Sequence, residues 1–149
     1  MEDGSRRFAP VSTAAAVASF ADFQGRWHVR RVLVDHLSRA VHHFAGNVIV
    51  TASTFVETGT LRYGTVSLKA ERRYALEGSD SDLAIAFADG RPFIHLDGCA
   101  AQTVRHLCGE DDYRGRFFFR SADAWVEAWR VSGPRKRYAS LARYQRQTA

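Results

Sequence analysis

The chain contains one stretch in which several reactive side chains lie close together, VRHLCGEDDY at residues 104–113. His106 and Cys108 are two positions apart, and two aspartates and Tyr113 follow after a glycine. An imidazole beside a thiol could form a nucleophile with its base, or supply two ligands to a metal ion. The same letters also describe an inward strand end and a tight turn, because Gly and Asp favour turns. We favour the strand and turn, with Cys108 as a small buried side chain and Tyr113 near the rim.

Metal binding is not expected from the remaining histidines. A structural zinc site usually shows paired Cys/His motifs, whereas this chain offers one His-x-Cys and a distant His95. His42 and His43 are adjacent, so their side chains diverge on a strand and cannot chelate one ion together. The sequence therefore predicts no metal site.

Alternation of apolar and polar residues dominates after residue 25, and this pattern predicts strands. A short helix is expected at 12–23, where Ser or Thr can cap an alanine-rich run. Short connections imply antiparallel neighbours, and closure into a barrel removes the exposed edges. We therefore predict an all-β, antiparallel up-and-down barrel with a flexible N-terminus at 1–11 and a single domain at 12–149. The expected strands are 25–35, 44–53, 54–63, 65–76, 82–88, 91–97, 102–108, 113–120, 124–132 and 136–146.

Composition narrows the possible partners. No apolar run approaches the roughly 18 residues that a membrane helix needs, so no membrane partner is expected. The N-terminal residues do not resemble a secretory signal, and the two cysteines need not pair, so a cytoplasmic protein is expected. The net charge of +5 favours anionic partners. Most of the arginines fit a solvated strand face, and nucleic acid is not the favoured partner.

Gly25, Arg26 and Trp27, which open the first strand after a short helix, resemble the calycin barrels, the group of lipocalins and fatty-acid-binding proteins. This resemblance implies that Trp27 plugs one barrel end and that Arg143 or Arg146 packs on it. It also leaves haem as a minor cofactor possibility, since some such barrels hold haem by one histidine, here His95 or His106.

The chain also resembles an uncharacterised family of small bacterial domains. The shared marks are GRW, F-x-G (Phe44, Gly46), DGR-x-F (Asp89 to Phe93), H-x-C-x-x-D-x-Y (His106 to Tyr113) and W-x-V-x-GP-x-K-x-Y (Trp129 to Tyr138). This second resemblance supports the fold and implies no activity.

Alternation also predicts the side chains that face the interior. On 54–63 and 65–76, Glu57 and Arg72 point inward and could pair, and the apolar residues of the same parity, such as Tyr63, Val66 and Leu68, share this face. On 91–97, Phe93 and His95 share one face, and Arg30 is a further possible interior charge. The predicted ligand-binding residues are Glu57, Arg72, Phe93, His95, His106, Cys108, Tyr113, Trp129, Lys136 and Tyr138.

Three functions are compatible with such an interior, in decreasing order of preference. The first is a barrel, monomeric or homodimeric, that binds a small, partly apolar and anionic molecule. The second is an acid–base enzyme (isomerase, cyclase or hydrolase) with His106 or His95 as base and Tyr138 or Tyr113 as donor to an oxyanion. The third is a nucleic-acid or protein interaction barrel that uses its outer arginines and has a side-chain-filled interior.

Overall fold

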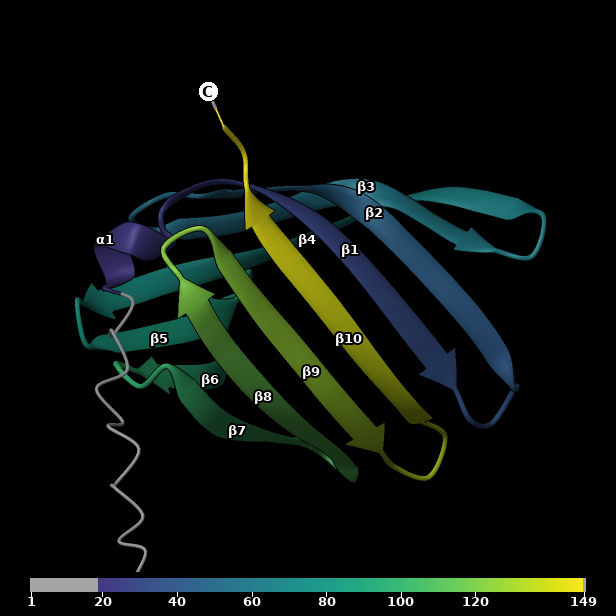
Figure 1. Cartoon of the computed structure of the whole chain (residues 1–149). Coiled ribbons are helices and arrows are strands. Elements are labelled where there is room, and N and C mark those ends of the chain that lie inside the picture. Colours follow the sequence, from purple (N-terminus) through teal and green to yellow (C-terminus); the bar gives the residue numbers. More distant parts are fainter. Residues whose placement is uncertain (1–18, 149) are drawn as a thin grey trace, which may run out of the picture.

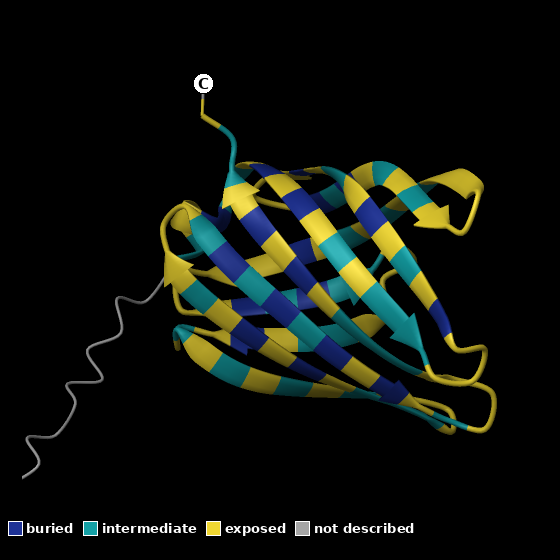
Figure 2. Ribbon diagram, turned by 45° about the vertical axis from the view of Figure 1, so that its right-hand side comes forward, coloured by how far each residue is buried: buried dark blue, intermediate teal, exposed yellow. Residues whose placement is uncertain are grey.

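The computed structural model describes residues 19–148, which form one antiparallel barrel with a short helix at one end (Figure 1). Buried and exposed residues alternate along most strands, so each strand gives one face to the interior and one to solvent (Figure 2). The elements are α1 (Phe20–Phe23), β1 (Gly25–Asp35), β2 (Ala40–Val50), β3 (Thr54–Tyr63), β4 (Val66–Ser79), β5 (Asp82–Phe87), β6 (Pro92–Asp97), β7 (Ala101–Cys108), β8 (Asp111–Ser121), β9 (Ala124–Ser132) and β10 (Arg137–Arg146).

Strands adjacent in the chain pair with each other, except β6 with β7, and β1 also pairs with β10. The barrel is therefore closed apart from one seam between the edges of β6 and β7. Across this seam the Gln102 side chain accepts a hydrogen bond from Asp97 N at 2.8 Å and donates to Asp97 O at 3.0 Å. The predicted all-β up-and-down barrel is confirmed. Within residues 19–148, no helix has the length and apolarity to cross a membrane.

The largest difference from the predicted element bounds is in β2. The sequence predicts a strand at 44–53, but β2 begins at Ala40 because residues 40–44 pair with the last residues of β1. Residues 51–53 form a turn instead, in which Thr51 N donates to Thr54 O at 2.9 Å. The predicted helix is present at its C-terminal end as α1, while residues 12–18 and the predicted flexible segment 1–11 lie outside the described residues.

α1 lies at one end of the barrel, which we call the closed end (Figure 1). Aromatic side chains fill this end. Phe23 of α1 lies against Phe55 and Trp125, with ring centroids 6.3 and 5.3 Å apart. Trp27 is 2% exposed, and its Nε1 donates to Phe23 O at 3.0 Å. Burial of these rings supplies apolar area from both the helix and the strands, so α1 is held as part of the core.

Arg146 covers the closed end from the last strand. Its guanidinium carbon lies 4.3 Å from the Trp27 ring centroid, in cation–π geometry. It also donates to Gln24 O at 2.9 Å and to Ala122 O at 2.7 Å, which ties the start of β1 to the β8–β9 turn. Of the two arginines expected here, Arg146 therefore fulfils the role, and Arg143 is exposed on the outer face of β10.

We call the opposite end the mouth; there the β3–β4 hairpin extends beyond β5 (Figure 1). β5 pairs only with the second half of β4, from Tyr74 onward. Tyr63, Val66 and Leu68 are consequently 48%, 47% and 57% exposed. The sequence predicted these three side chains to be interior; that prediction is wrong because, within residues 19–148, the first half of β4 has no strand paired on the β5 side, so this end of the hairpin is open to solvent.

Candidate functional site

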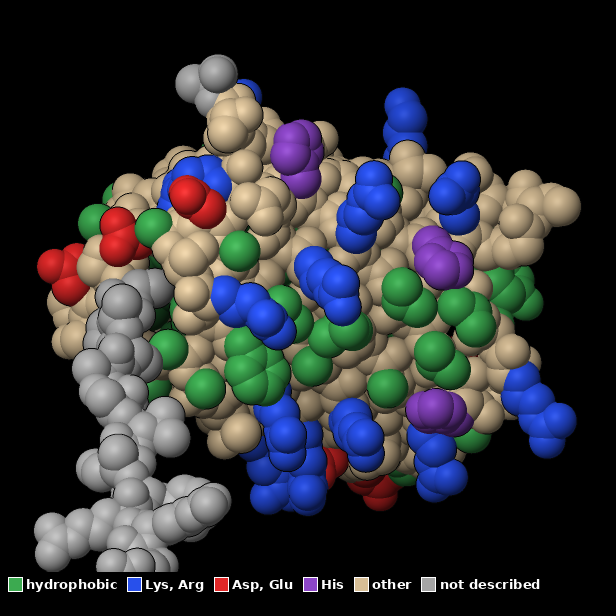
Figure 3. All heavy atoms as spheres, viewed as in Figure 1, with side chains coloured by type: hydrophobic (Ala, Val, Ile, Leu, Met, Phe, Trp, Pro, Cys, Tyr) green, Lys and Arg blue, Asp and Glu red, His purple; other side chains and the backbone are tan. Residues whose placement is uncertain are grey.

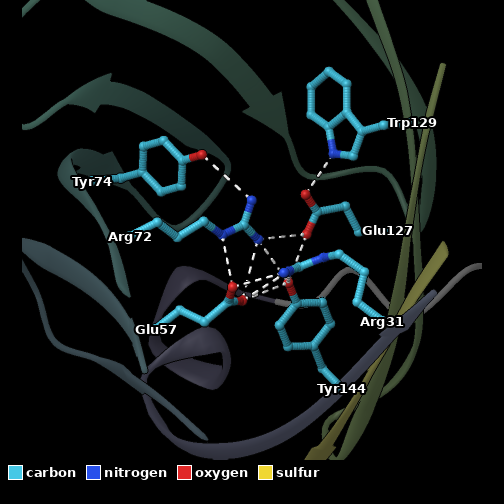
Figure 4. A network of polar contacts seen from close by, with 7 residues as sticks. All are labelled: Arg31, Glu57, Arg72, Tyr74, Glu127, Trp129 and Tyr144. Atoms are coloured by element: carbon cyan, nitrogen blue, oxygen red, sulfur yellow. Dashed lines mark hydrogen bonds and ion pairs between the residues drawn. The ribbon is translucent and has the colours of Figure 1, made fainter. Parts of the chain in front are cut away.

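A network of charged side chains lies inside the barrel (Figure 4). Arg31 of β1 donates from Nη1 and Nη2 to the two carboxylate oxygens of Glu57 on β3, each at 2.8 Å. Arg72 of β4 places Nε 3.0 Å from Glu57 Oε1 and Nη2 3.4 Å from Glu127 Oε2 on β9. The expected pairing of Glu57 with Arg72 is present because the β3–β4 register places them directly opposite. Charges from four strands thus converge at one point.

Tyr144 of β10 joins the two halves of this network. Its hydroxyl accepts from Arg31 Nη2 and Arg72 Nη2, both at 2.9 Å, and donates to Glu127 Oε2 at 2.8 Å. Glu127 also accepts from Trp129 Nε1. A buried charge costs several kcal/mol unless it is paired. Two arginines balance two glutamates, which explains how Glu57 and Glu127 can be only 2% and 5% exposed.

The electrostatics fix the protonation states of the network. Burial alone would raise the pKa of Glu57, but the hydrogen bonds and positive charges of Arg31 and Arg72 outweigh it and lower this pKa below its usual value. Burial, reinforced by the Glu127 carboxylate, raises the pKa of Tyr144 well above its usual value. Glu57 is therefore a carboxylate at neutral pH and Tyr144 is a neutral phenol, which keeps Tyr144 as a hydrogen-bond donor.

A pocket of about 200 Å³ opens at the mouth above this network, and we call it the mouth pocket. Arg31, Glu57 and Arg72 line its polar part. Apolar side chains make up most of the wall of the pocket, and His42 also lines it. The other lining residues are Leu33, His42, Phe44, Leu61, Ala70 and Glu71. The pocket therefore combines an apolar wall with a small charged patch.

Gly59 is needed for the shape of this wall. A Cβ atom at Gly59 would lie 2.7 Å from Cζ of Phe44 and 2.3 Å from Ala45 O, so no larger residue fits without a shift. The Phe44 ring that occupies this space has the Arg31 guanidinium 5.2 Å from its centroid. The glycine thus lets one aromatic ring form the wall and also hold Arg31 by a cation–π contact.

Deeper in the barrel, the interior is nearly filled. A second space of about 30 Å³, the inner cavity, is lined by Arg72, Phe93, Glu127 and Trp129 among others. That volume holds about one water molecule. Arg72 lines both spaces and so separates the inner cavity from the mouth pocket. Inside the barrel, a ligand larger than water therefore has room only in the mouth pocket unless Arg72 moves.

Three of the predicted ligand-binding residues lie together in an aromatic cluster beside the inner cavity. Phe93 stacks on Trp129 with ring centroids 5.5 Å apart, and His106 meets Phe93 edge-on at 5.2 Å. A Cβ at Gly115 would lie 2.8 Å from the Trp129 ring, so this glycine makes space for the indole. Trp129 belongs to the hydrophobic core, Phe93 packs against it, and His106 adds a half-buried ring to the cluster.

Three other predicted residues form the rim of the mouth on its far wall. Lys136 Nζ donates to the Tyr113 hydroxyl at 3.0 Å and lies 3.5 Å from Asp111 Oδ2. Burial, followed by the proximity of Tyr113, raises the pKa of Tyr138 to about 12. Tyr138 is therefore a neutral phenol near neutral pH, where it can donate and accept hydrogen bonds.

His95 does not face the interior. The register between β5 and β6 shifts at Ile85/Ala86, so Phe93 and Leu96 both point inward while His95 turns outward. His95 Nε2 lies 2.9 Å from Asp82 Oδ1 on the surface. The prediction that Phe93 and His95 share the interior face is wrong because a β-bulge reverses the alternation between them.

Cys108 and Arg30 are also displaced from the predicted interior. Cys108 has the inward parity but lies at the last position of β7, where it is exposed instead of buried. The turn that follows it consists of Gly109, at φ 59°, and Glu110, as the turn composition indicated. Arg30 is exposed on the outer face of β1, and its neighbour Arg31 is the inward arginine.

Sequence reasoning did not assign Arg31, Glu127 and Tyr144 to the site. Glu127 has the same strand parity as Trp129, and Tyr144 has the same parity as Tyr138, so the available signal was a charge and a phenol on the faces of two predicted site residues. Arg31 could have been found by extending the alternation from Trp27 through Val29 along β1. The alternation along each strand is therefore enough to place Arg31, Glu127 and Tyr144 on inward faces. Their hydrogen-bond partners lie on distant strands and are known only from the tertiary structure.

Among the described residues we find no site that would hold either of the two groups considered from the sequence, a metal ion or haem. No group of three or more His, Cys, Asp or Glu residues within 19–148 could hold a metal ion. Haem does not fit beside His106, because the inner cavity has room for about one water molecule. It does not fit at His95 either, because that side chain lies on the surface in contact with Asp82.

Residues 23–146 match the model of the family of unknown function DUF6314. The chain belongs to this family. The resemblance to an uncharacterised family is thereby confirmed, and the family itself brings no assigned activity. Among the curated proteins, none matches this sequence.

Two solved structures show the same fold at low identity. The S-type phycobiliprotein lyase CpeS from Guillardia theta is 11% identical with a TM-score of 0.53, over 87% of this chain and 91% of that chain. A protein of unknown function from the DUF3598 family of Nostoc punctiforme is 9% identical with a TM-score of 0.60. That match covers 88% of this chain and only 50% of the other, so this chain spans about half its length.

Proposed function

We propose that this protein binds a small, partly apolar, anionic molecule in the mouth pocket. The observation that carries the proposal is that the mouth pocket has a mostly apolar wall and two guanidinium groups, those of Arg31 and Arg72, at its base. Ligand sites are typically concave and mostly apolar, with a few placed polar groups. Leu33, Leu61 and Ala70 supply the apolar contact, and Arg31 and Arg72 supply the counter-charge.

The charge balance of the pocket favours an anion. Arg31 and Arg72 line it with one buried carboxylate, Glu57, between them, because Glu127 lies on the side of the inner cavity. Glu71 also lines the pocket, but it is exposed and its carboxylate is paired with Arg73. The buried network as a whole is neutral, because Glu127 balances the second arginine. The pocket lining itself contains two guanidiniums and only one buried carboxylate, which favours a carboxylate or a similar head group as the ligand.

The size of the pocket limits the ligand. At about 200 Å³ the pocket is smaller than the roughly 300–1,000 Å³ typical of drug-sized ligands. A short acyl chain or one aromatic ring with an acidic group suits this volume. The phycobiliprotein lyase shares the fold, which makes such a barrel a reasonable host for small-molecule chemistry, although fold similarity alone does not transfer a ligand.

The proposal is tested with octanoate and its neutral counterpart octanol, titrated into the protein by isothermal calorimetry. We expect octanoate to bind at least tenfold more tightly, because the carboxylate meets Arg31 and Arg72. Ala70→Trp fills the pocket and should abolish binding. Ala45→Trp, at an exposed position of β2, is the matched control and should leave binding unchanged.

Two results would overturn this proposal. Octanoate binding that survives in the Ala70→Trp protein would place the ligand elsewhere. Equal affinity for octanoate and octanol, or no binding of either, would remove the role of the two arginines as an anion site. Circular dichroism of both variants verifies that each has folded.

A further inference from the structure

The outer face of β9 is the floor of a groove, which we call the β9 groove. Two surface hollows, of about 440 and 890 Å³, follow each other along this strand. Their floor is made by the small outward side chains of Ala124, Val126 and Ala128, and β8 and β10 form the walls. Hydrophobic side chains gather across the middle of this face, with Lys and Arg side chains on both sides of them (Figure 3).

The walls of the β9 groove are strongly basic. Seven arginines line the two hollows, and among the described residues no aspartate or glutamate does so. The arginines are Arg30, Arg105, Arg114, Arg116, Arg120, Arg130 and Arg143. Asp112, which lies next to the groove, is already paired with Arg105 and Arg114. The groove thus has an excess of positive charge that this part of the chain does not neutralise.

The strand register makes this charge arrangement unfavourable for the fold alone. Arg30 lies directly opposite Arg143, and Arg114 directly opposite Arg130. Like charges directly opposite on neighbouring strands are destabilising. Within residues 19–148, neither Arg30, Arg143 nor Arg130 forms an ion pair. An external anionic partner would relieve this repulsion.

We propose that the β9 groove docks an acidic amphipathic helix of a partner protein. β8 and β10 lie two strand spacings apart in the sheet, about 9.6 Å. Their outward side chains therefore flank a strip about as wide as the 10–12 Å diameter of a helix. From Ala124 to Arg130 the floor is about 20 Å long, or roughly 13 residues of helix. An apolar helix face would lie on Ala124, Val126 and Ala128, with carboxylates along its flanks above the arginines.

Three other occupants fit the groove less well. A second copy of this chain would bring arginines against arginines. A nucleic acid would meet the phosphate-binding arginines, but Phe118 is the one exposed Phe, Tyr or Trp ring among the described lining residues and can stack on a single base, and the Ala and Val floor offers no hydrogen bonds to bases. A lipid surface would touch the walls but would not fill a hollow between them. Arginine around an apolar centre is instead typical of protein–protein interfaces.

The test uses a labelled synthetic helical peptide of about 16 residues as the probe. Leucine and alanine occupy its positions i, i+3, i+4 and i+7, and glutamate flanks them. A scrambled peptide of identical composition and charge is the control. Fluorescence anisotropy should show at least tenfold tighter binding of the patterned peptide. Arg130→Gln with Arg143→Gln should weaken it and reduce its salt dependence.

Ala128→Trp fills the floor without changing any charge, and it should reduce affinity for the patterned peptide at least tenfold. Ala45→Trp, on the outer face of β2, should have no effect. Equal binding of both peptides, or an unchanged affinity of the Ala128→Trp protein, would overturn the helix proposal. Tighter binding of oligothymidylate, or of vesicles containing phosphatidylglycerol, would also overturn it and identify the other occupant.

Discussion

The two ends of this barrel are built from the same ten strands but have opposite chemistry. At the closed end, α1 and Arg146 cover an aromatic core around Trp27 and Trp125. At the mouth, the first half of β4 has no paired strand on the β5 side in the described part of the chain, and the mouth pocket lies above Arg31, Glu57 and Arg72. One end buries apolar rings completely, whereas the other holds buried charges beneath an opening.

This difference separates stability from recognition. Burial of aromatic side chains is the largest favourable contribution at the closed end. The charged network contributes less net stability, because desolvation offsets much of the attraction within a buried ion pair. Its pairing instead holds two guanidiniums in fixed positions at the base of a pocket. We expect substitutions at the closed end to act on folding, and substitutions in the charged network at the mouth to weaken both ligand binding and folding.

The largest effect on stability is expected from Trp27→Ala. The substitution removes a side chain that is 2% exposed and takes away the ring beneath Arg146, so we expect the free energy of unfolding to fall by about 3–5 kcal/mol. Tyr63→Ala, in the exposed hairpin, is the control and should change it by less than about 0.5 kcal/mol. Urea denaturation measures both, and similar losses for the two variants would contradict the division between the ends.

A smaller loss is expected from Glu57→Gln. The variant leaves Arg31 and Arg72 with only Glu127 as a counter-charge, and we expect destabilisation of about 3 kcal/mol, at the low end for a broken buried pair because both arginines are partly exposed. Glu71→Gln, on the exposed face of β4, should change stability by less than about 1 kcal/mol. Thermal or urea denaturation measures both variants. If Glu57→Gln and Glu71→Gln lose the same stability, the charged network does not stabilise the mouth.

The smallest effect is a change in pH dependence. The pKa of Glu57 is lower in the folded protein than in the unfolded chain, so its contribution is fully present above about pH 4.3 and is lost as pH falls through the folded pKa. Glu57→Gln lacks this titration. The stability difference between wild type and variant should therefore narrow as the pH falls below about 4.3. Thermal melts from neutral to acidic pH measure it, and a constant difference would exclude Glu57 as the titrating group.

The strand pattern made much of this architecture predictable. Alternation around Trp27, Glu57 and Arg72 gave the strands, their inward faces and one ion pair, since neighbours in an antiparallel meander are also neighbours in the chain. It failed at His95, where a bulge reverses the parity, and at Cys108, where parity is right but the strand ends. Both failures are local, because alternation cannot show where a strand bends or stops being covered.

The sequence by itself therefore determined the all-β barrel, the helix at one end and the identity of most inward side chains, because these depend on periodicity and short connections. Only the tertiary structure decided that Arg31, Glu127 and Tyr144 join Glu57 and Arg72, since these contacts connect strands up to 113 residues apart. It also decided that the deep interior is filled and that the available volume lies at the mouth. Packing across the barrel depends on the volumes and positions of side chains from many strands at once, so it cannot be predicted from the local sequence pattern of any one strand.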